Sequence, residues 1–214
     1  MPLFFQQDVN HDARLAVWLI GEEEAFFRKL AIPQREVVHP HKRLQHLSGR
    51  FLLRHLYPDF PSELIRIADT RKPYLEDDAY HFSISHCSDY AAAIVSPGQR
   101  VGIDIEVVTE KAARIRAKFA ADEEWALAQQ AVQSLEWTGS IDALAATLIW
   151  SCKEAGFKWY GTGEVDFKKH MPIQACTRKG DVFETKMLFQ KETPQALHIC
   201  SRLLGGIWLS YVVA

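Results

Sequence analysis

Two carboxylates, Asp104 and Glu106, stand two residues apart in an otherwise apolar segment, residues 101–108. The alternation of β-branched and acidic residues predicts a strand, in which side chains at positions i and i+2 share one face. Two carboxylates side by side repel each other and are costly to desolvate unless a cation or strong donors neutralise them. A divalent metal ion that prefers oxygen ligands would explain this pair. An edge strand whose polar face meets water would explain it equally well.

A second chemically interesting segment, residues 82–88, predicts a strand that ends in hydroxyls and an imidazole. Ser85 and His86 at such a strand end could donate hydrogen bonds to a phosphate oxygen. Serines near a turn can also bond to backbone amides, which is the simpler interpretation of Ser85 alone. The sequence leaves both interpretations open.

Two further segments carry cations or a carboxylate. Glu154 and Lys158 are neighbours at i and i+4 on a predicted long helix, residues 141–160, where such a pair is often only a surface contact. Lys72 precedes Pro73, whose rigid ring would aim the lysine, although a solvated turn lysine is the simpler interpretation. Taken together, the four segments supply the carboxylates and donors that a magnesium-bound diphosphate requires.

The elements that must position these residues are helices and strands in both halves of the chain. Apolar residues at helical spacing predict helices over residues 41–56 and 141–160. Strands are predicted over residues 15–20, 65–68, 81–85, 90–95, 101–108, 182–190, 196–202 and 207–213. Loosely similar hairpin patterns in the two halves indicate a duplicated unit. We therefore expect an α+β fold in which each half holds helices and a short group of antiparallel strands.

Composition narrows the classes of function. The chain has 214 residues and a net charge of −2, which gives no electrostatic argument for a nucleic-acid or membrane partner. It has no apolar run of the ~20 residues that a membrane span needs, and its first residues lack the pattern of a signal peptide. The four cysteines are scattered without a CxxC pair, so we expect a reducing, cytoplasmic location and no structural zinc.

Four short motifs, in this order, resemble the signatures of the 4′-phosphopantetheinyl transferases, specifically of the two-lobed Sfp type. The matching segments are RKP at 71–73 for G-K-P, SISH at 83–86 for (N/S)-I-S-H, GIDIE at 102–106 for G-I-D-I-E, and WSCKE at 150–154 for W-S-x-K-E. Lys158 and GTG at 161–163 continue the last motif in the usual K-x-x-G-x-G form. The chain departs from the pattern at Arg71, which replaces the first glycine, and at Gln45, where many relatives have a basic residue.

The resemblance implies an enzyme that transfers the 4′-phosphopantetheine group of coenzyme A to a serine hydroxyl of an apo carrier protein and releases 3′,5′-ADP. It implies that Asp104, Glu106 and Glu154 bind Mg²⁺, with Mn²⁺ as an alternative. Catalysis is expected from Asp104, from Glu154 as the base that accepts the serine proton directly or through water, and from Lys158. Contacts with coenzyme A are expected from Arg35, Arg43, Arg50, Lys72, Pro73, Ser85, His86, Lys153 and Lys158.

The resemblance also implies an α+β fold of two pseudo-two-fold related lobes, each with a small, mostly antiparallel sheet and packed helices. We expect an N-terminal lobe, residues 1–100, on the adenosine and phosphate side of coenzyme A. The C-terminal lobe, residues 101–214, would hold the metal site and the docking surface for the carrier protein. The active site would lie at the lobe interface, and because both lobes belong to one chain we expect a monomer.

A basic segment is the candidate docking surface for an acidic carrier protein. Its residues are Lys111, Arg114, Arg116 and Lys118, followed by Phe119. Opposite charges would make the two surfaces complementary, although a solvated helix face explains the segment equally well. Two other functions remain open from the residues alone: a coenzyme A or nucleotide-binding module without chemistry, and a magnesium-dependent nucleotide hydrolase.

Overall fold

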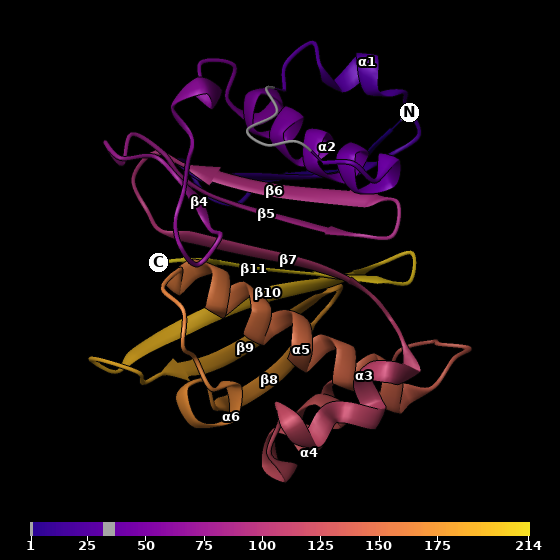
Figure 1. Ribbon diagram of the computed structural model, residues 1–214. Coiled ribbons are helices and arrows are strands. Elements are labelled where there is room, and N and C mark those ends of the chain that lie inside the picture. Colours follow the sequence, from indigo (N-terminus) through magenta and orange to yellow (C-terminus); the bar gives the residue numbers. More distant parts are fainter. Residues whose placement is uncertain (1, 32–36) are drawn as a thin grey trace. The chain divides into compact units, whose positions relative to one another are not determined.

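The computed structural model of the chain describes residues 2–31 and 37–214 (Figure 1). The chain divides into two compact units, Met1–Ile105 together with Val213–Ala214, and Glu106–Val212. The division falls within strand β7 (Val101–Val107). Asp104 therefore belongs to the first unit and Glu106 to the second, whereas we expected a boundary at residues 100/101.

The first unit is built on a four-stranded antiparallel sheet in the order β1-β2-β6-β5. Its strands are β1 (Leu3–Asp8), β2 (Arg14–Leu19), β5 (His81–Cys87) and β6 (Tyr90–Ser96). A short hairpin, β3 (Arg66–Ile67) and β4 (Pro73–Tyr74), precedes β5 in the chain. The helical elements are α1 (Glu24–Phe27), α2 (Pro40–Leu56) and the 3₁₀ turn η1 (Ser62–Leu64).

Helix α2 packs on the sheet of the first unit (Figure 1). It begins with a proline at its first position, and the imidazole of His39 accepts a hydrogen bond from the amide of Lys42 at 3.4 Å. The approach to β5 is close, because a Cβ atom on Gly49 would lie 2.5 Å from Cγ2 of Ile84. Glycine at this position therefore sets the distance between α2 and the strand that carries Ser85 and His86.

The second unit contains strands β8 to β11 of the five-stranded sheet β7-β11-β10-β9-β8, and β7 is divided between the units. The last four strands are joined in sequence by hairpins: β8 (Ile173–Lys179), β9 (Val182–Phe189), β10 (Gln195–Leu204) and β11 (Ile207–Val213). The helices are α3 (Glu110–Ile115), the 3₁₀ turn η2 (Arg116–Lys118), α4 (Asp122–Val132), α5 (Ile141–Tyr160) and α6 (Phe167–His170).

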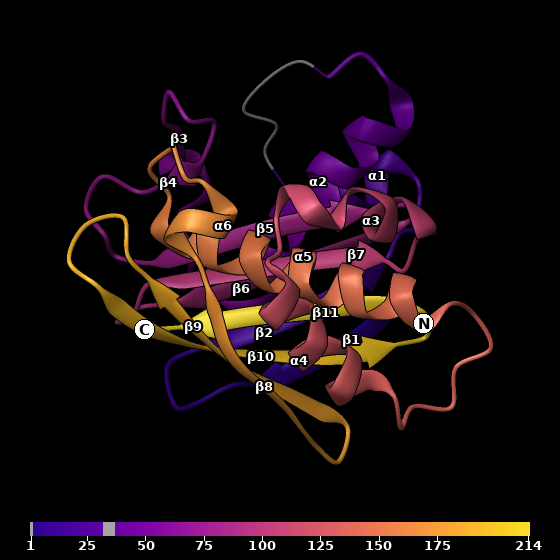
Figure 2. The same ribbon diagram turned by 90° about the horizontal axis from the view of Figure 1, so that it is seen from below.

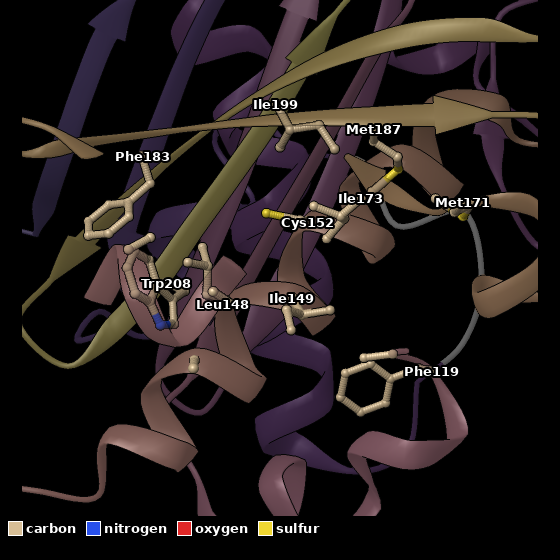
Figure 3. Close-up of a cluster of buried hydrophobic side chains, with 14 of the residues drawn as sticks. Phe119, Leu148, Ile149, Cys152, Met171, Ile173, Phe183, Met187, Ile199 and Trp208 are labelled. Atoms are coloured by element: carbon tan, nitrogen blue, oxygen red, sulfur yellow. The ribbon is translucent and has the colours of Figure 1, made fainter. Parts of the chain in front are cut away.

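Helix α5 organises the second unit. The hydroxyl of Ser140 accepts from the amide of Ala143 at its start, and Gly161 with φ 81° ends it in the left-handed conformation. Figures 1 and 2 show α5 lying against the sheet of this unit. Its apolar face meets a core drawn in Figure 3, in which the fully buried Trp208 donates from its indole nitrogen to the carbonyl of Leu144 at 3.0 Å.

The predicted α+β class is confirmed, with antiparallel sheets of four and five strands and packed helices. In each unit a long helix, α2 or α5, packs against an antiparallel sheet. None of the helices in the described part of the chain combines the length and apolar character that a membrane crossing requires.

Candidate functional site

The first unit contains a pocket of about 310 Å³ between helix α2, the β3–β4 hairpin and strand β5. Its lining residues are Gln45, His46, Arg50, Ile67, Arg71, Pro73, Ile84 and His86. Arg50, Pro73 and His86, three of the predicted contacts with coenzyme A, are thus brought together in one place. The sequence analysis missed His46, although it lies one helical turn from Arg50 and so shares its face of α2.

The pocket is lined with cationic and imidazole groups. Arg50 is 5% exposed, and its Nη1 lies 3.4 Å from Nδ1 of His46. Arg71 is exposed, and so is His86. No carboxylate is among the lining residues in the described part of the chain. A pocket with this composition is suited to an anion.

Lys72 adjoins this pocket in the chain, between Arg71 and Pro73. Burial, together with the positive charge of Arg100, lowers the pKa of Lys72 to about 8. Both causes disfavour the ammonium form, so above pH 8 a nearby anion would be bound together with a proton.

Ser85 makes hydrogen bonds within the protein. Its hydroxyl, 6% exposed, donates to Oδ1 of Asp104 at 3.0 Å and accepts from the amide of Ile105 at 3.3 Å. Ser83 likewise accepts from the amide of Ile103 at 3.2 Å. The simpler interpretation of these serines, bonding to backbone amides, therefore describes their structural role. Ser85 in addition holds one oxygen of the buried Asp104 carboxylate.

In the second unit, Glu106 is held by helix α5. Its Oε1 accepts a hydrogen bond from the indole nitrogen of Trp150 at 3.2 Å. Trp150, Glu154 and Lys158 follow one another at intervals of four residues, which places them on one face of α5. The Trp150 ring in turn packs against Phe119, with ring centroids 5.1 Å apart. The face that contacts Glu106 is therefore the face that carries Glu154 and Lys158.

Lys153 does not share that face. Its ammonium group, 0% exposed, lies 2.6 Å from Oε1 of Glu124 and donates to the carbonyls of Phe119 and Phe167 at 2.8 and 2.9 Å. Burial lowers the pKa of Lys153, and the bond to Glu124 opposes that shift. We expected Lys153 to contact coenzyme A, but the structure places it in the core with three protein partners, as many as its ammonium has hydrogens.

Arg43 and Arg35 were also predicted to contact coenzyme A. Arg43 bonds to Oε2 of Glu24 at 2.7 Å and to the carbonyls of Val37 and Val38 at 2.9 and 3.1 Å. Its guanidinium therefore connects α2 to α1 and to the segment before α2. This role differs from the ligand contact that we expected. Arg35 lies outside the described residues.

The basic segment predicted for docking is only partly exposed. Lys111, Arg114 and Lys118 are exposed. Arg116 pairs with Asp122 at 2.9 Å and lies over the ring of Trp125, and Phe119 is buried. Arg116 and Phe119 therefore have structural partners, and three cations remain for an external contact.

The three predicted metal ligands are divided between the units, with Asp104 in the first and Glu106 and Glu154 in the second. Among residues 2–31 and 37–214, no three His, Cys, Asp or Glu side chains gather closely enough to hold a metal ion. The chemistry of the donors nevertheless fits Mg²⁺, since all three are carboxylates. Two of them are already oriented by neutral donors, Ser85 for Asp104 and Trp150 for Glu106.

Comparison with known proteins identifies the family of this chain. No curated protein matches the chain. A family model matches residues 100–213, a segment that contains Asp104, Glu106, Glu154 and Lys158, while the RKP and SISH motifs precede it. Because this match covers more than half of its 214 residues, the chain belongs to the 4′-phosphopantetheinyl transferase superfamily.

Proposed function

We propose that this chain is a magnesium-dependent 4′-phosphopantetheinyl transferase of the two-lobed Sfp type. It transfers the phosphopantetheine group of coenzyme A to a serine hydroxyl of an apo carrier protein and releases 3′,5′-ADP. The observation that carries the proposal is the family match over residues 100–213, which includes all three predicted metal ligands and Lys158. The anion-suited pocket of the first unit supports coenzyme A as the donor substrate.

Asp104, Glu106 and Glu154 would hold the metal ion in this proposal. The chemistry that Mg²⁺ supplies at such a site is neutralisation of charge on the diphosphate oxygens. The protein's own contribution is to orient the carboxylates: the Ser85 hydroxyl holds Asp104, and the Trp150 indole holds Glu106. Fixed ligands need no reorganisation when the substrate arrives.

Glu154 and Lys158 would act on the reacting groups. Glu154 would accept the proton of the carrier serine, directly or through water, because an unactivated hydroxyl is a poor nucleophile. Lys158, one turn further along the same face of α5, would bind a diphosphate oxygen and stabilise the charge that develops on the leaving nucleotide. Both residues are half-buried, whereas Lys153 is fully buried.

The carrier protein would dock at the three exposed cations of the basic segment, Lys111, Arg114 and Lys118. An acidic carrier surface would be attracted to them before the serine is positioned.

The test is a transfer assay with coenzyme A, Mg²⁺ and an apo carrier protein, followed by mass spectrometry of the carrier. We expect the carrier to gain one phosphopantetheine group. Asp104→Asn keeps an oxygen acceptor for Ser85 but removes the charge, so it should lower the rate by at least about a hundredfold while the protein stays folded. Glu63→Ala, which removes an exposed acid of the same unit, is the matched control and should leave the rate unchanged.

The other outcomes identify the alternative functions. Nucleotide release from coenzyme A without a gain in carrier mass would indicate a hydrolase. Binding of coenzyme A without either product would indicate a binding module. A near-normal rate for Asp104→Asn would remove the basis for the metal site.

A further inference from the structure

Arg71 occupies a backbone conformation that favours glycine. Its φ is 66°, in the left-handed region, where a Cβ atom is unfavourable. It closes the turn between β3 and β4, in which its amide donates to the carbonyl of Ala68 at 2.8 Å and the amide of Ala68 donates to the carbonyl of Lys72 at 2.9 Å. A glycine would adopt this conformation without strain, so the arginine side chain needs a compensating role.

The position of Arg71 indicates what that role is. Four non-glycine residues in the described part of the chain have positive φ, namely Arg71, Asp78, Ser88 and Glu164. Of these, Arg71 is the one that lines the pocket. Among the described residues, its guanidinium makes no ion pair or hydrogen bond. The turn thus directs a cation to the pocket without giving it a protein partner.

The other groups at the pocket suit a highly charged phosphate. Arg50 is nine-tenths buried, and two imidazoles, His46 and His86, lie in the same lining. Gln45 also lines the pocket; its amide nitrogen donates to the carbonyl of Ser88 at 2.7 Å, and its buried amide oxygen has no hydrogen-bond partner among the described residues. The described lining of the pocket has two guanidinium groups and no carboxylate, which suits a phosphate monoester with nearly two charges and three acceptor oxygens.

We infer that Arg71 is a specificity-determining residue that recognises the 3′-phosphate monoester on the ribose of coenzyme A. Gln45 and Arg71 line the same pocket. Helix α2 contributes the neutral amide of Gln45 and the guanidinium of Arg50, and the β3–β4 turn contributes the second guanidinium, that of Arg71. The planar guanidinium of Arg71 can donate two parallel hydrogen bonds to the phosphate.

This inference rests on the proposed function. Binding measurements with two ligands can test the role of Arg71 separately from that function. Coenzyme A and 3′-dephospho-coenzyme A differ only in the phosphate assigned to Arg71. Their dissociation constants would be measured by calorimetry without a carrier protein. We expect the wild-type chain to bind coenzyme A at least about tenfold more tightly.

Arg71→Gly is the informative variant. It should weaken binding of coenzyme A by about tenfold, leave binding of 3′-dephospho-coenzyme A unchanged, and give a melting temperature no lower than that of the parent, because glycine relieves the left-handed conformation. Arg71→Asn, which tolerates this conformation but carries no charge, should behave in the same way. Arg66→Ala is the matched control: it removes an exposed arginine of the same hairpin that does not line the pocket, and should change neither affinity.

Three results would overturn the inference. One is an equal loss of affinity for both ligands in Arg71→Gly, and another is no loss for either. The third is a melting temperature several degrees lower, which would assign Arg71 a structural role. If the wild-type chain binds neither ligand and transfers nothing, the proposed function itself fails. If it transfers phosphopantetheine while Arg71→Gly keeps its full preference for coenzyme A, only the assignment of Arg71 fails.

Discussion

The buried cations of the two units have different surroundings. In the second unit, Lys153 is fully enclosed, but its charge is matched by Glu124 and by two backbone carbonyls. In the first unit, the pocket that contains the nearly buried Arg50 has no carboxylate in its described lining, and both causes of the pKa shift of the adjoining Lys72 act against its charge. A cation that the protein neutralises itself stabilises the fold. A cationic pocket whose described lining holds no carboxylate is suited to an anionic ligand.

The largest expected effect comes from breaking the neutralised pair in the second unit. Lys153→Met keeps most of the side-chain volume but leaves Glu124 buried without its cation. Glu124 also accepts from the amides of Ala121 and Ile173 at 2.7 and 2.8 Å, so the pair joins several segments. The expected loss in the free energy of unfolding is about 3–5 kcal/mol, measured by urea denaturation.

A second variant keeps this prediction specific to the pair. In Lys153→Met combined with Glu124→Gln, no buried charge remains, so the loss should be smaller than the sum of the two single losses. Additive losses would show that Lys153 and Glu124 act independently. Lys153 would then no longer be an example of a buried cation that the protein neutralises.

The next effect concerns Lys72, whose pKa of about 8 makes anion binding sensitive to pH. Below pH 8 the free protein already carries the proton, so the affinity for 3′,5′-ADP should be nearly constant from about pH 7 to 8. Above pH 8 the proton must be taken up on binding, and the affinity should fall by at most about tenfold per pH unit. Calorimetry in buffers of different ionisation enthalpy would measure both the affinity and the proton uptake.

Lys72→Arg is the matched variant, because a guanidinium stays protonated over this range. Its affinity should be flat from about pH 7 to 9.5. If the variant and the parent show the same pH dependence, another group takes up the proton, and Lys72 does not belong to the anion site.

The sequence predicted the elements better than the directions of the side chains. Apolar spacing located α2 and α5 to within a residue because both helices have one continuous buried face. It missed β1 and β8, in which few residues are buried. A strand with few buried residues has a weak hydrophobic pattern.

The placement of Lys153 shows why a motif did not predict the site fully. The WSCKE motif lists Lys153 beside Glu154, but successive residues on a helix point about 100° apart. Lys153 lies with the buried Ile149, Cys152 and Gly156, so a helical projection would have assigned it to the core. The left-handed conformation of Arg71 had no such signal, because arginine carries no preference for it.

The smallest expected effect concerns surface cations of the basic segment, where paired and exposed arginines can be compared. Arg114 is exposed and is available to a carrier protein, whereas Arg116 is already paired with Asp122 and stacked on Trp125. Arg114→Glu should raise the KM for the carrier several-fold and leave the KM for coenzyme A unchanged, and the effect should shrink with added salt. Lys186→Glu makes the same charge change at an exposed site on β9 and should alter neither constant. A change in carrier docking alone would not alter the KM for coenzyme A. Equal changes in both KM values for Arg114→Glu would therefore indicate that the carrier docks elsewhere.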